Sequence, residues 1–495
     1  MGDLGKKNAG RVGLPVMAAC APPERRSPVA ARRGAGKPAT APIVGFVSLG
    51  CAKNLVDSEM MLGRIAESGA VVTGDEDAAD TMVVNTCGFL ESSRREAMEI
   101  IAELAQRKRR GELRRIVVAG CLVQRDGERI RDAVPEVDAL VGVNNRDDIV
   151  RAVWRLDRDA TVDRYLGDYH ASQAGTWQDQ GRLRLTPRHY AYVRISEGCN
   201  QKCTFCTIPS IRGPLRCKTP DELVAECAEL SADGARELLL IGQDTTSYGA
   251  DVGYEAGLAG LLRTLDGACD GADWIRLMYV YPSVLTDEII DAIAASERIV
   301  KYIDMPLQHI SDRMLRRMHR RVTRRQTETL LEKLRRRVPG VALRTTFIVG
   351  FPGETSAEFE ELEAFVRGFG FDAAGAFRYS REPETPAGRM KEQLDAPLIE
   401  ERHQRLMLAQ QAVAFERARG WIGRRFEVVV DARRKDGAVA RHAQQAPEVD
   451  AVCLGRLNAA AGSVLAAECR GTDGYDLIIE EVRRSEERQR SDVAT

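Results

Sequence analysis

The chain has 495 residues, more than a single hydrophobic core usually organises, so two to four domains are expected. Its 72 basic and 73 acidic residues give a formal net charge of -1. This balance excludes binding of nucleic acid through overall positive charge and leaves only local patches for such a role. No apolar run approaches the roughly 18 residues that cross a bilayer, and the first residues contain no continuous apolar segment typical of export. We therefore expect a cytoplasmic protein with no membrane partner.

Residues 1–40 are rich in Ala, Arg, Pro and Gly and show no apolar periodicity, so we predict a disordered extension. An Arg-rich, acid-poor start is also typical of an organelle transit peptide, but no amphipathic helix is evident here.

Residues 43–155 alternate between strand-like and helix-like segments, which is typical of a parallel sheet covered by helices. We predict an α/β domain with a doubly wound parallel sheet. Its strand candidates are IVGFVSLG, DTMVVNTC and RRIVVAGC. The polar residues 156–184 have little periodicity and are expected to form a linker.

Residues 185–418 contain a second alternating series with six strand candidates. These are AYVRIS, ELLLIG, WIRLMYV, YIDMPLQ, LRTTFIVG and AGAFRYS. Six strand and helix units in about 200 residues predict an open, partial (β/α)6 barrel rather than a complete one of eight units. After a helix near residues 398–419, short strand-like runs predict a small C-terminal all-β barrel over residues 419–488.

The 12 cysteines are unlikely disulfide partners in a reducing cytosol, so metal or cluster ligation is expected for those in motifs. Cys199, Cys203 and Cys206 form a CxxxCxxC motif directly after the first strand of the second series. Three thiolates can hold three irons of a 4Fe-4S cluster and leave the fourth iron open. A structural zinc site is the alternative, but it normally needs a fourth ligand, and no Cys or His stands at the usual short spacing.

A second set of cysteines, Cys51, Cys87 and Cys121, lies in the first domain. Each follows a separate predicted strand, and parallel strands end at one edge of their sheet, where such folds bind ligands. A single cysteine there is usually a small buried apolar residue. Three together favour a second cluster.

The CxxxCxxC motif, the aromatic residue before its third cysteine and the following (β/α) series resemble the radical S-adenosylmethionine (SAM) superfamily. In that superfamily the open iron binds SAM, and one-electron reduction cleaves SAM to a 5′-deoxyadenosyl radical. The resemblance implies SAM contacts at Gln243 and Asp244 of GQD and at Gly350, Gly353 and Glu354 of GFPGE. Ordinary turn chemistry is the alternative for both segments.

The two cysteine triplets together resemble the methylthiotransferase family, over about 450 residues from Ile43 onward. The resemblance implies two 4Fe-4S clusters, with the auxiliary one on the first triplet delivering sulfur. It also implies SAM as both methyl donor and radical source. A reductant protein and a sulfur donor would be further partners.

The motifs GCAKNLVDSEMMLG, IGQDTTSYG, YIDMPLQH, RTTFIVGFPGE and APEVDA resemble the branch that modifies an aspartate of the twelfth small-subunit ribosomal protein, free or in the small ribosomal subunit. The other branch modifies N6-isopentenyladenosine in tRNA. Residues 421–495, which include the TRAM-like barrel, contain 12 Lys or Arg and 13 Asp or Glu. A region with this charge balance is expected to bind RNA only weakly, but it suits a basic protein as its partner.

One residue departs from the expected pattern, and another has two possible roles. Gln201 occupies a position where a basic residue or His would be unsurprising, and His309 after a predicted strand can be either a site residue or a structural histidine. A non-catalytic iron–sulfur electron carrier is the competing class. It predicts reducible clusters without SAM cleavage.

Overall fold

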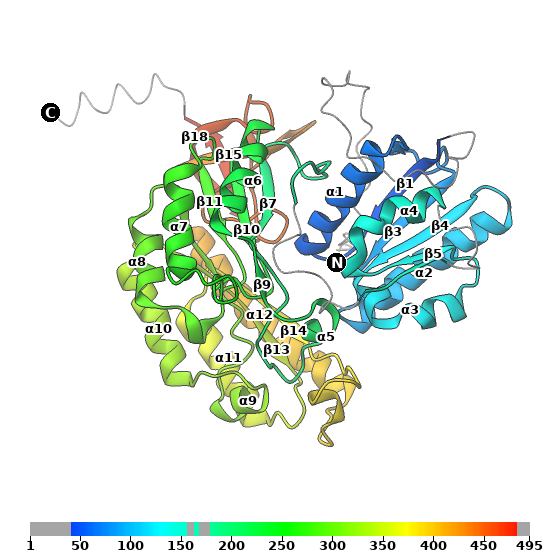
Figure 1. The fold of residues 1–495 in the computed structure, drawn as a ribbon. Helices are drawn as coiled ribbons and strands as arrows, with labels where there is room; N and C mark the ends of the chain where they lie inside the picture. The colour runs from blue at the N-terminus through cyan, green and yellow to red at the C-terminus, as the bar shows by residue number, and fades with distance from the viewer. Residues whose placement is uncertain (1–40, 156–162, 168–178, 483–495) are drawn as a thin grey trace. The chain divides into compact units, whose positions relative to one another are not determined.

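The computed structural model describes residues 41–155, 163–167 and 179–482, so the predicted extension at residues 1–40 lies outside the described residues. The chain divides into two compact units. The N-terminal unit runs to Leu185 and also includes Thr207–Pro214, and the C-terminal unit contains the remaining residues from Thr186 onward. Figure 1 labels the helices and strands of both.

The N-terminal unit is built on a six-stranded sheet in the order β2-β1-β3-β4-β5-β6, with every neighbouring pair parallel. Its strands are β1 (Ile43–Ser48), β2 (Val71–Thr73), β3 (Thr81–Thr86), β4 (Arg115–Gly120), β5 (Ala139–Val141) and β6 (Asp163–Tyr165). The main helices are α1 (Ala52–Glu67), α2 (Glu91–Arg109), α3 (Cys121–Ala133) and α4 (Ile149–Trp154).

Alternate residues of the strands build two separate cores. Val84 and Val118 belong to the core that includes α2 and α3, whereas their neighbours Val83 and Val117 belong to the core that includes α1 and α4. Successive side chains of a strand point to opposite faces, so a strand buried on both sides is an almost continuous apolar run. The doubly wound parallel sheet predicted from the sequence is confirmed.

The short strand β6 lies within residues 156–184, which the sequence predicts to be a linker. It pairs with β5, and the carboxylate of Asp163 binds the buried guanidinium of Arg115. This part of the segment therefore completes the sheet. Residues 156–162 and 168–178 of the predicted linker lie outside the described residues.

The C-terminal unit contains an open six-stranded parallel sheet in the order β14-β13-β12-β11-β10-β7. Its strands are β7 (Tyr190–Arg194), β10 (Glu237–Ile241), β11 (Trp274–Leu277), β12 (Ile299–Asp304), β13 (Ala342–Val349) and β14 (Ala373–Arg378). The helices around it include α6 (Pro220–Ala232), α7 (Gly257–Ala268), α8 (Asp287–Ala295), α10 (Arg324–Arg337), α11 (Ser356–Phe369) and α12 (Ala396–Arg419). The predicted partial (β/α)6 barrel is thus present, with all six strand candidates in place.

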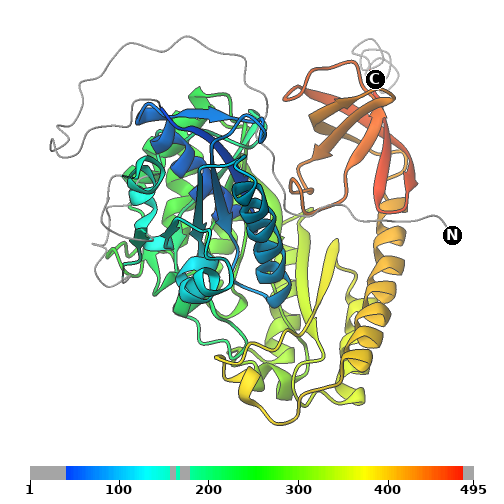
Figure 2. The ribbon, with the colours of Figure 1, turned by 90° about the vertical axis from the view of Figure 1, so that its right-hand side faces the viewer.

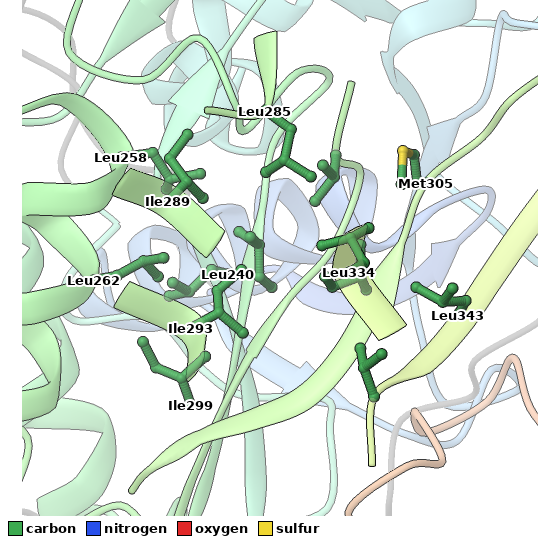
Figure 3. Close-up of a cluster of buried hydrophobic side chains, with 14 of the residues drawn as sticks. Leu240, Leu258, Leu262, Leu285, Ile289, Ile293, Ile299, Met305, Leu334 and Leu343 are labelled. Atoms are coloured by element: carbon green, nitrogen blue, oxygen red, sulfur yellow. The ribbon is translucent and has the colours of Figure 1, made fainter. Parts of the chain in front are cut away.

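One large apolar core joins these strands to their helices. Figure 3 shows Leu240 of β10 close to Leu262 of α7 and Ile293 of α8. Cys217, Cys227 and Cys269 are buried in the same core. Cysteine behaves there as a small apolar side chain.

The chain ends in a closed five-stranded barrel with the order β15-β16-β17-β19-β18. Its strands are β15 (Arg425–Arg434), β16 (Gly437–His442), β17 (Cys453–Arg456), β18 (Val464–Asp473) and β19 (Asp476–Glu481). In Figure 2, α12 runs directly into this barrel, drawn in orange and red. Cys453 and Cys469 lie in its apolar core. Nowhere in the described residues is there a helix both long and apolar enough to cross a membrane.

A buried ion network ties this barrel to the parallel sheet of the same unit. Glu237 at the start of β10 accepts hydrogen bonds from Arg276 of β11 at 2.7 Å and pairs with Arg441 of β16 at 2.8 Å. The three side chains are at most 2% exposed. Burial raises the pKa of the Glu237 carboxyl, but Arg441 and Arg276 outweigh this effect and hold its pKa below the ordinary value.

We predict that Glu237→Gln lowers the free energy of unfolding of the C-terminal unit by about 3 kcal/mol, because it leaves the buried guanidinium of Arg276 without its anion and removes one of the two carboxylates that pair with Arg441. Urea denaturation followed by the fluorescence of Trp274 and Trp421 measures the change. Asp273→Asn is the control, since the Arg236–Asp273 pair is half exposed and its loss should cost less than about 1 kcal/mol. Equal losses of unfolding free energy in the two variants would show that the buried network is not a main connection between the barrel and the sheet.

Candidate functional site

The first cysteine triplet lies at the carboxyl edge of the N-terminal sheet. Cys51 precedes α1 after β1, Cys87 follows β3, and Cys121 is the first residue of α3 after β4. The strand order reverses between β1 and β3, and in open α/β sheets ligands bind at such a switch point. The edge predicted for all three thiols is therefore the edge at which the structure places them.

Glycines allow these three strand ends to approach one another. Gly50 has a φ of +97°, and a Cβ placed on it would lie 2.8 Å from Cβ of Cys87. Gly120 has a φ of +96°, and a Cβ there would lie 2.7 Å from the carbonyl oxygen of Thr86. Both positions need the left-handed backbone region and the missing side chain.

Buried amides connect the same strand ends. The side-chain amide of Asn54 donates to the carbonyl oxygens of Leu49 and Thr86, each at 2.9 Å, and so links the end of β1 to that of β3. The Thr86 hydroxyl in turn donates to the carbonyl oxygen of Ala119 in β4 at 2.6 Å. Such a satisfied buried network rigidifies the edge that carries the thiols.

Arg212 brings a positive charge to this edge. It lies in the short helix α5 (Ile208–Arg212), which belongs to the N-terminal unit. Its guanidinium donates to Oδ2 of Asp57 at 2.9 Å and to Sγ of Cys121 at 3.2 Å. Burial raises the pKa of the Cys121 thiol to about 12, and Arg212 opposes that rise. Burial, followed by the charge of Cys51, also raises the pKa of Cys87.

The chemistry of this donor set fits an iron–sulfur cluster better than a single ion. A single zinc ion in a structural site takes four protein ligands, whereas three thiolates can hold three irons of a 4Fe-4S cluster. In a cluster each thiolate binds a different iron, so the sulfurs stand further apart. Cys87 and Cys51 both interact electrostatically with Cys121, so the three thiols lie near one another.

The second triplet lies on the loop that follows β7 and the short strand β8 (Ser196–Glu197) in the C-terminal unit. The Gln201 amide N–H donates to Sγ of Cys199 at 3.4 Å, and the Cys206 N–H donates to the carbonyl oxygen of Cys203 at 3.1 Å. Burial raises the pKa of the Cys199 thiol to about 12. The loop is therefore turned tightly around its thiols, as a three-cysteine cluster loop requires.

The GQD segment directly after β10 holds this loop. The Gln201 side chain donates to Asp244 at 2.9 Å, and the Gln243 side chain donates to Glu197 at 2.8 Å. Glu197 is also paired with Arg194 at 2.8 Å. Gln201, the departure noted in the sequence, thus has a defined role here, because it connects the cysteine loop to the neighbouring strand end.

Two buried oxygens beside this loop have no hydrogen-bond partner within the described part of the chain. They are Oγ of Ser196 and Oε1 of Gln243. Buried polar atoms are nearly always satisfied, by protein, water or a ligand. Both oxygens can therefore accept a hydrogen bond from a bound polar molecule.

Tyr281 and Arg320 surround Cys203. The Tyr281 hydroxyl lies 4.0 Å from Sγ of Cys203, and a guanidinium nitrogen of Arg320 lies 3.6 Å from the same sulfur. The Arg320 guanidinium also lies 3.8 Å over the Tyr281 ring, which fixes its position. The arginine thus places a positive charge beside the sulfur that is predicted to bind the cluster.

The GFPGE segment follows β13, and its carboxylate is bound within the protein. Glu354 accepts from the N–H of Gly350 at 2.9 Å and from Arg402 at 2.6 Å, and lies 3.1 Å from His309. His309 is fully buried and also accepts from the N–H of Ser311, so it has the structural role that the sequence left open. Glu354 shapes the turn through its side chain, and Gly353 has a φ of +76° in the same turn.

Sequence reasoning missed Arg194, Glu197, Arg212, Tyr281 and Arg320. Arg194 stands in the strand candidate AYVRIS, and Arg212 follows Cys206 by six residues, but neither position marks a site residue. Nothing in the spacing of these residues distinguishes a buried arginine from the many exposed ones.

Comparison with known families agrees with this geometry. The radical SAM superfamily matches residues 193–366, Uncharacterized protein family UPF0004 matches residues 44–142, and the TRAM domain matches residues 422–482. The radical SAM methyltransferase TsrM from Kitasatospora setae has a similar fold, with a TM-score of 0.52 at 15% identity over 70% of this chain and 74% of that one. Fold and cysteine loop together define a radical SAM protein.

Relatives of higher similarity give the family. Ribosomal protein uS12 methylthiotransferase RimO of Trichlorobacter lovleyi is 41% identical over 88% of this chain and 97% of its own length. RimO of Anaeromyxobacter sp. is 44% identical over 89% of this chain and 93% of its own length. RimO of Syntrophotalea carbinolica is 42% identical, with 90% and 98% covered. The chain belongs to the RimO family of radical SAM methylthiotransferases.

We predict that Gly50→Ala lowers the iron bound after anaerobic reconstitution by about half, because the new methyl group displaces Cys87 and disables one of two clusters. Gly69→Ala is the matched control. Gly69 also has a positive φ, +85°, but a Cβ there meets nothing within 4 Å. It should lose about 1 kcal/mol of stability and no iron. Full iron content in Gly50→Ala would argue against a metal role for this edge.

Proposed function

We propose that this protein attaches a methylthio group to the β-carbon of an aspartate in ribosomal protein uS12. The observation that carries the proposal is the pair of cysteine triplets, each at the carboxyl edge of a separate parallel sheet, in a chain of the RimO family. In this proposal Cys51, Cys87 and Cys121 hold the auxiliary 4Fe-4S cluster, and Cys199, Cys203 and Cys206 hold the radical SAM cluster.

Each region has a role in this proposal. Residues 43–155, with strand β6 at the edge of their sheet, carry the auxiliary cluster, and residues 185–418 carry the radical chemistry. Residues 419–488 recognise the substrate. Gln243 and Asp244 are proposed SAM contacts, and so is the turn with Gly350, Gly353 and Glu354. The Glu354 carboxylate is bound by Arg402, and the N–H groups of Gly350, Gly353 and Glu354 also have partners within the protein, so in this proposal the turn acts chiefly through its fixed shape.

When bound, the clusters and SAM supply the electron transfer, the radical and the sulfur. The protein supplies position and charge. Gln201 holds the cysteine loop to Asp244, and the cation of Arg320 lies next to Cys203, where it faces the negative charge of a bound cluster. The unpartnered oxygens of Ser196 and Gln243 are placed to orient a polar cofactor.

The tRNA alternative has less support. Residues 421–495 have one more acidic than basic residue, and an RNA-binding module should be clearly basic. The relatives cited above act, by their names, on uS12. We further propose that the protein works in the cytoplasm, on free uS12 or the small ribosomal subunit, with a reductant protein and a sulfur donor as partners.

The proposal is tested by offering small ribosomal subunits and tRNA together to the anaerobically reconstituted protein with SAM, a reductant and a sulfur source. Mass spectrometry then locates new methylthio groups. An added group on an aspartate of uS12 is the expected result. A group on tRNA adenosine would favour the alternative substrate, and SAM left uncleaved would favour an electron carrier.

The two triplets should have separable roles. We predict that Cys203→Ala reduces SAM cleavage at least a hundredfold, because the loop loses a ligand of the radical cluster. Cys87→Ala should retain SAM cleavage within about threefold but lose sulfur transfer. Release of 5′-deoxyadenosine and methylthiolation of uS12, measured in the same samples, separate the two effects. Equal loss of both activities in Cys87→Ala, with the radical cluster intact by spectroscopy, would contradict this division.

A further inference from the structure

Arg212 has a more specific environment than a structural arginine requires. Its side chain is 1% exposed, and one terminal nitrogen lies within hydrogen-bond distance of three atoms. These are Oδ1 of Asn54 at 2.7 Å, Oδ2 of Asp57 at 2.9 Å and Sγ of Cys121 at 3.2 Å. All belong to the N-terminal unit. The guanidinium is therefore fixed in orientation as well as in place.

Asp57 acts as the anchor of this arrangement. One of its carboxylate oxygens binds Arg212 and the other binds Arg146. The Asp57 side chain is only 2% exposed, so it is held from both sides. With the carboxylate fixed, the Arg212 nitrogen cannot turn away from the sulfur without breaking a buried, charged hydrogen bond.

A sulfur atom is a weak acceptor when it is a thiol and a much better one when it carries negative charge. A buried guanidinium held 3.2 Å from Cys121 is therefore well placed for the anionic sulfur of a cluster ligand. Hydrogen bonds to the sulfurs and nearby charge are two of the factors that set the reduction potential of an iron–sulfur cluster. A nearby cation favours the reduced state, which is one unit more negative.

We propose that Arg212 is a positioning residue that donates a hydrogen bond to the cluster-bound sulfur of Cys121 and raises the reduction potential of the auxiliary cluster. The inference rests on the proposed function, since it takes Cys51, Cys87 and Cys121 as ligands of that cluster. The redox step is the gain of one electron by the cluster from an external reductant, with no bond formed or broken in the protein.

The alternative is that Arg212 only fastens residues 207–214 to the rest of the N-terminal unit. In that case its replacement would change stability or iron content but not the potential of the cluster that remains. The potential is therefore the measurement that separates the two roles.

The experiment uses the full chain with Cys199, Cys203 and Cys206 replaced by Ala, so that only the auxiliary cluster is loaded. Iron is counted after anaerobic reconstitution, and the midpoint potential is measured by titration with dithionite followed by electron paramagnetic resonance. We expect Arg212→Gln to lower the ratio of reduced to oxidised cluster at least tenfold, when the ratio is measured at the midpoint potential of the parent. This corresponds to about 59 mV for one electron.

Arg146→Gln is the matched control, because Arg146 binds the other oxygen of Asp57. In Arg146→Gln the ratio of reduced to oxidised cluster should stay within twofold of the ratio in the parent. Arg212→Lys keeps the charge but loses the planar fork, so a fall of about threefold is expected. If Arg212→Gln does not load iron, the lysine variant decides the question.

An Arg212→Gln protein that binds iron normally and keeps the reduction potential of the parent would overturn the inference. If Arg212→Gln binds no iron, an Arg212→Lys protein with the reduction potential of the parent would overturn it instead. A shift of the same size in Arg146→Gln would also overturn it, because the effect would then be general charge. If the parent binds no cluster, the proposed function fails together with the inference. A loaded parent without a shift leaves the proposed function standing.

Discussion

Both sets of cysteines depend on one constraint, the common edge at which parallel strands end. Cys51, Cys87 and Cys121 are separated by more than 30 residues from one to the next, yet each follows a strand of the same parallel sheet. In the C-terminal unit the same constraint places the cysteine loop after β7 beside the GQD segment after β10. Without the parallel order of the strands, neither site would exist.

The strand ends can approach one another at these edges only because of particular residues next to them. Gly50 and Gly120 have no side chain, so the strand ends can lie in contact. The side chains of Asn54 and Thr86 bind backbone groups that the close approach leaves unpaired. Such groups would be costly if they were buried without partners. The arginines then add positive charge next to sulfur, Arg212 in one unit and Arg320 in the other. The two sites thus share a design although they belong to separate sheets.

Much of this could be predicted from the sequence because it depends on local patterns. The long apolar strands are recognisable from alternation with helices, and the cysteines from their place after those strands. The strands β2, β5 and β6 were missed because each has three residues and too little periodicity. Strand β6 also depends on the Arg115–Asp163 pair, whose partners are 48 positions apart in the chain.

The charged part of each site could not be predicted. Buried arginines such as Arg212 and Arg320 have no spacing rule, since they are chosen by the anions and sulfurs that surround them in the folded chain. The roles of His309 and Glu354 have the same origin. Their position after strands suggested a site, but only the folded chain brings Arg402 to the carboxylate.

We expect each of the two separate thiol triplets to hold its own 4Fe-4S cluster. Mössbauer spectroscopy of protein reconstituted with ⁵⁷Fe tests it most directly, on the unmodified chain and on two variants in which one triplet is replaced by alanine. About eight irons per chain in 4Fe-4S form are expected in the unmodified chain, and about four in each variant. A single cluster in the unmodified chain, or a triplet that binds zinc and no iron, would contradict it.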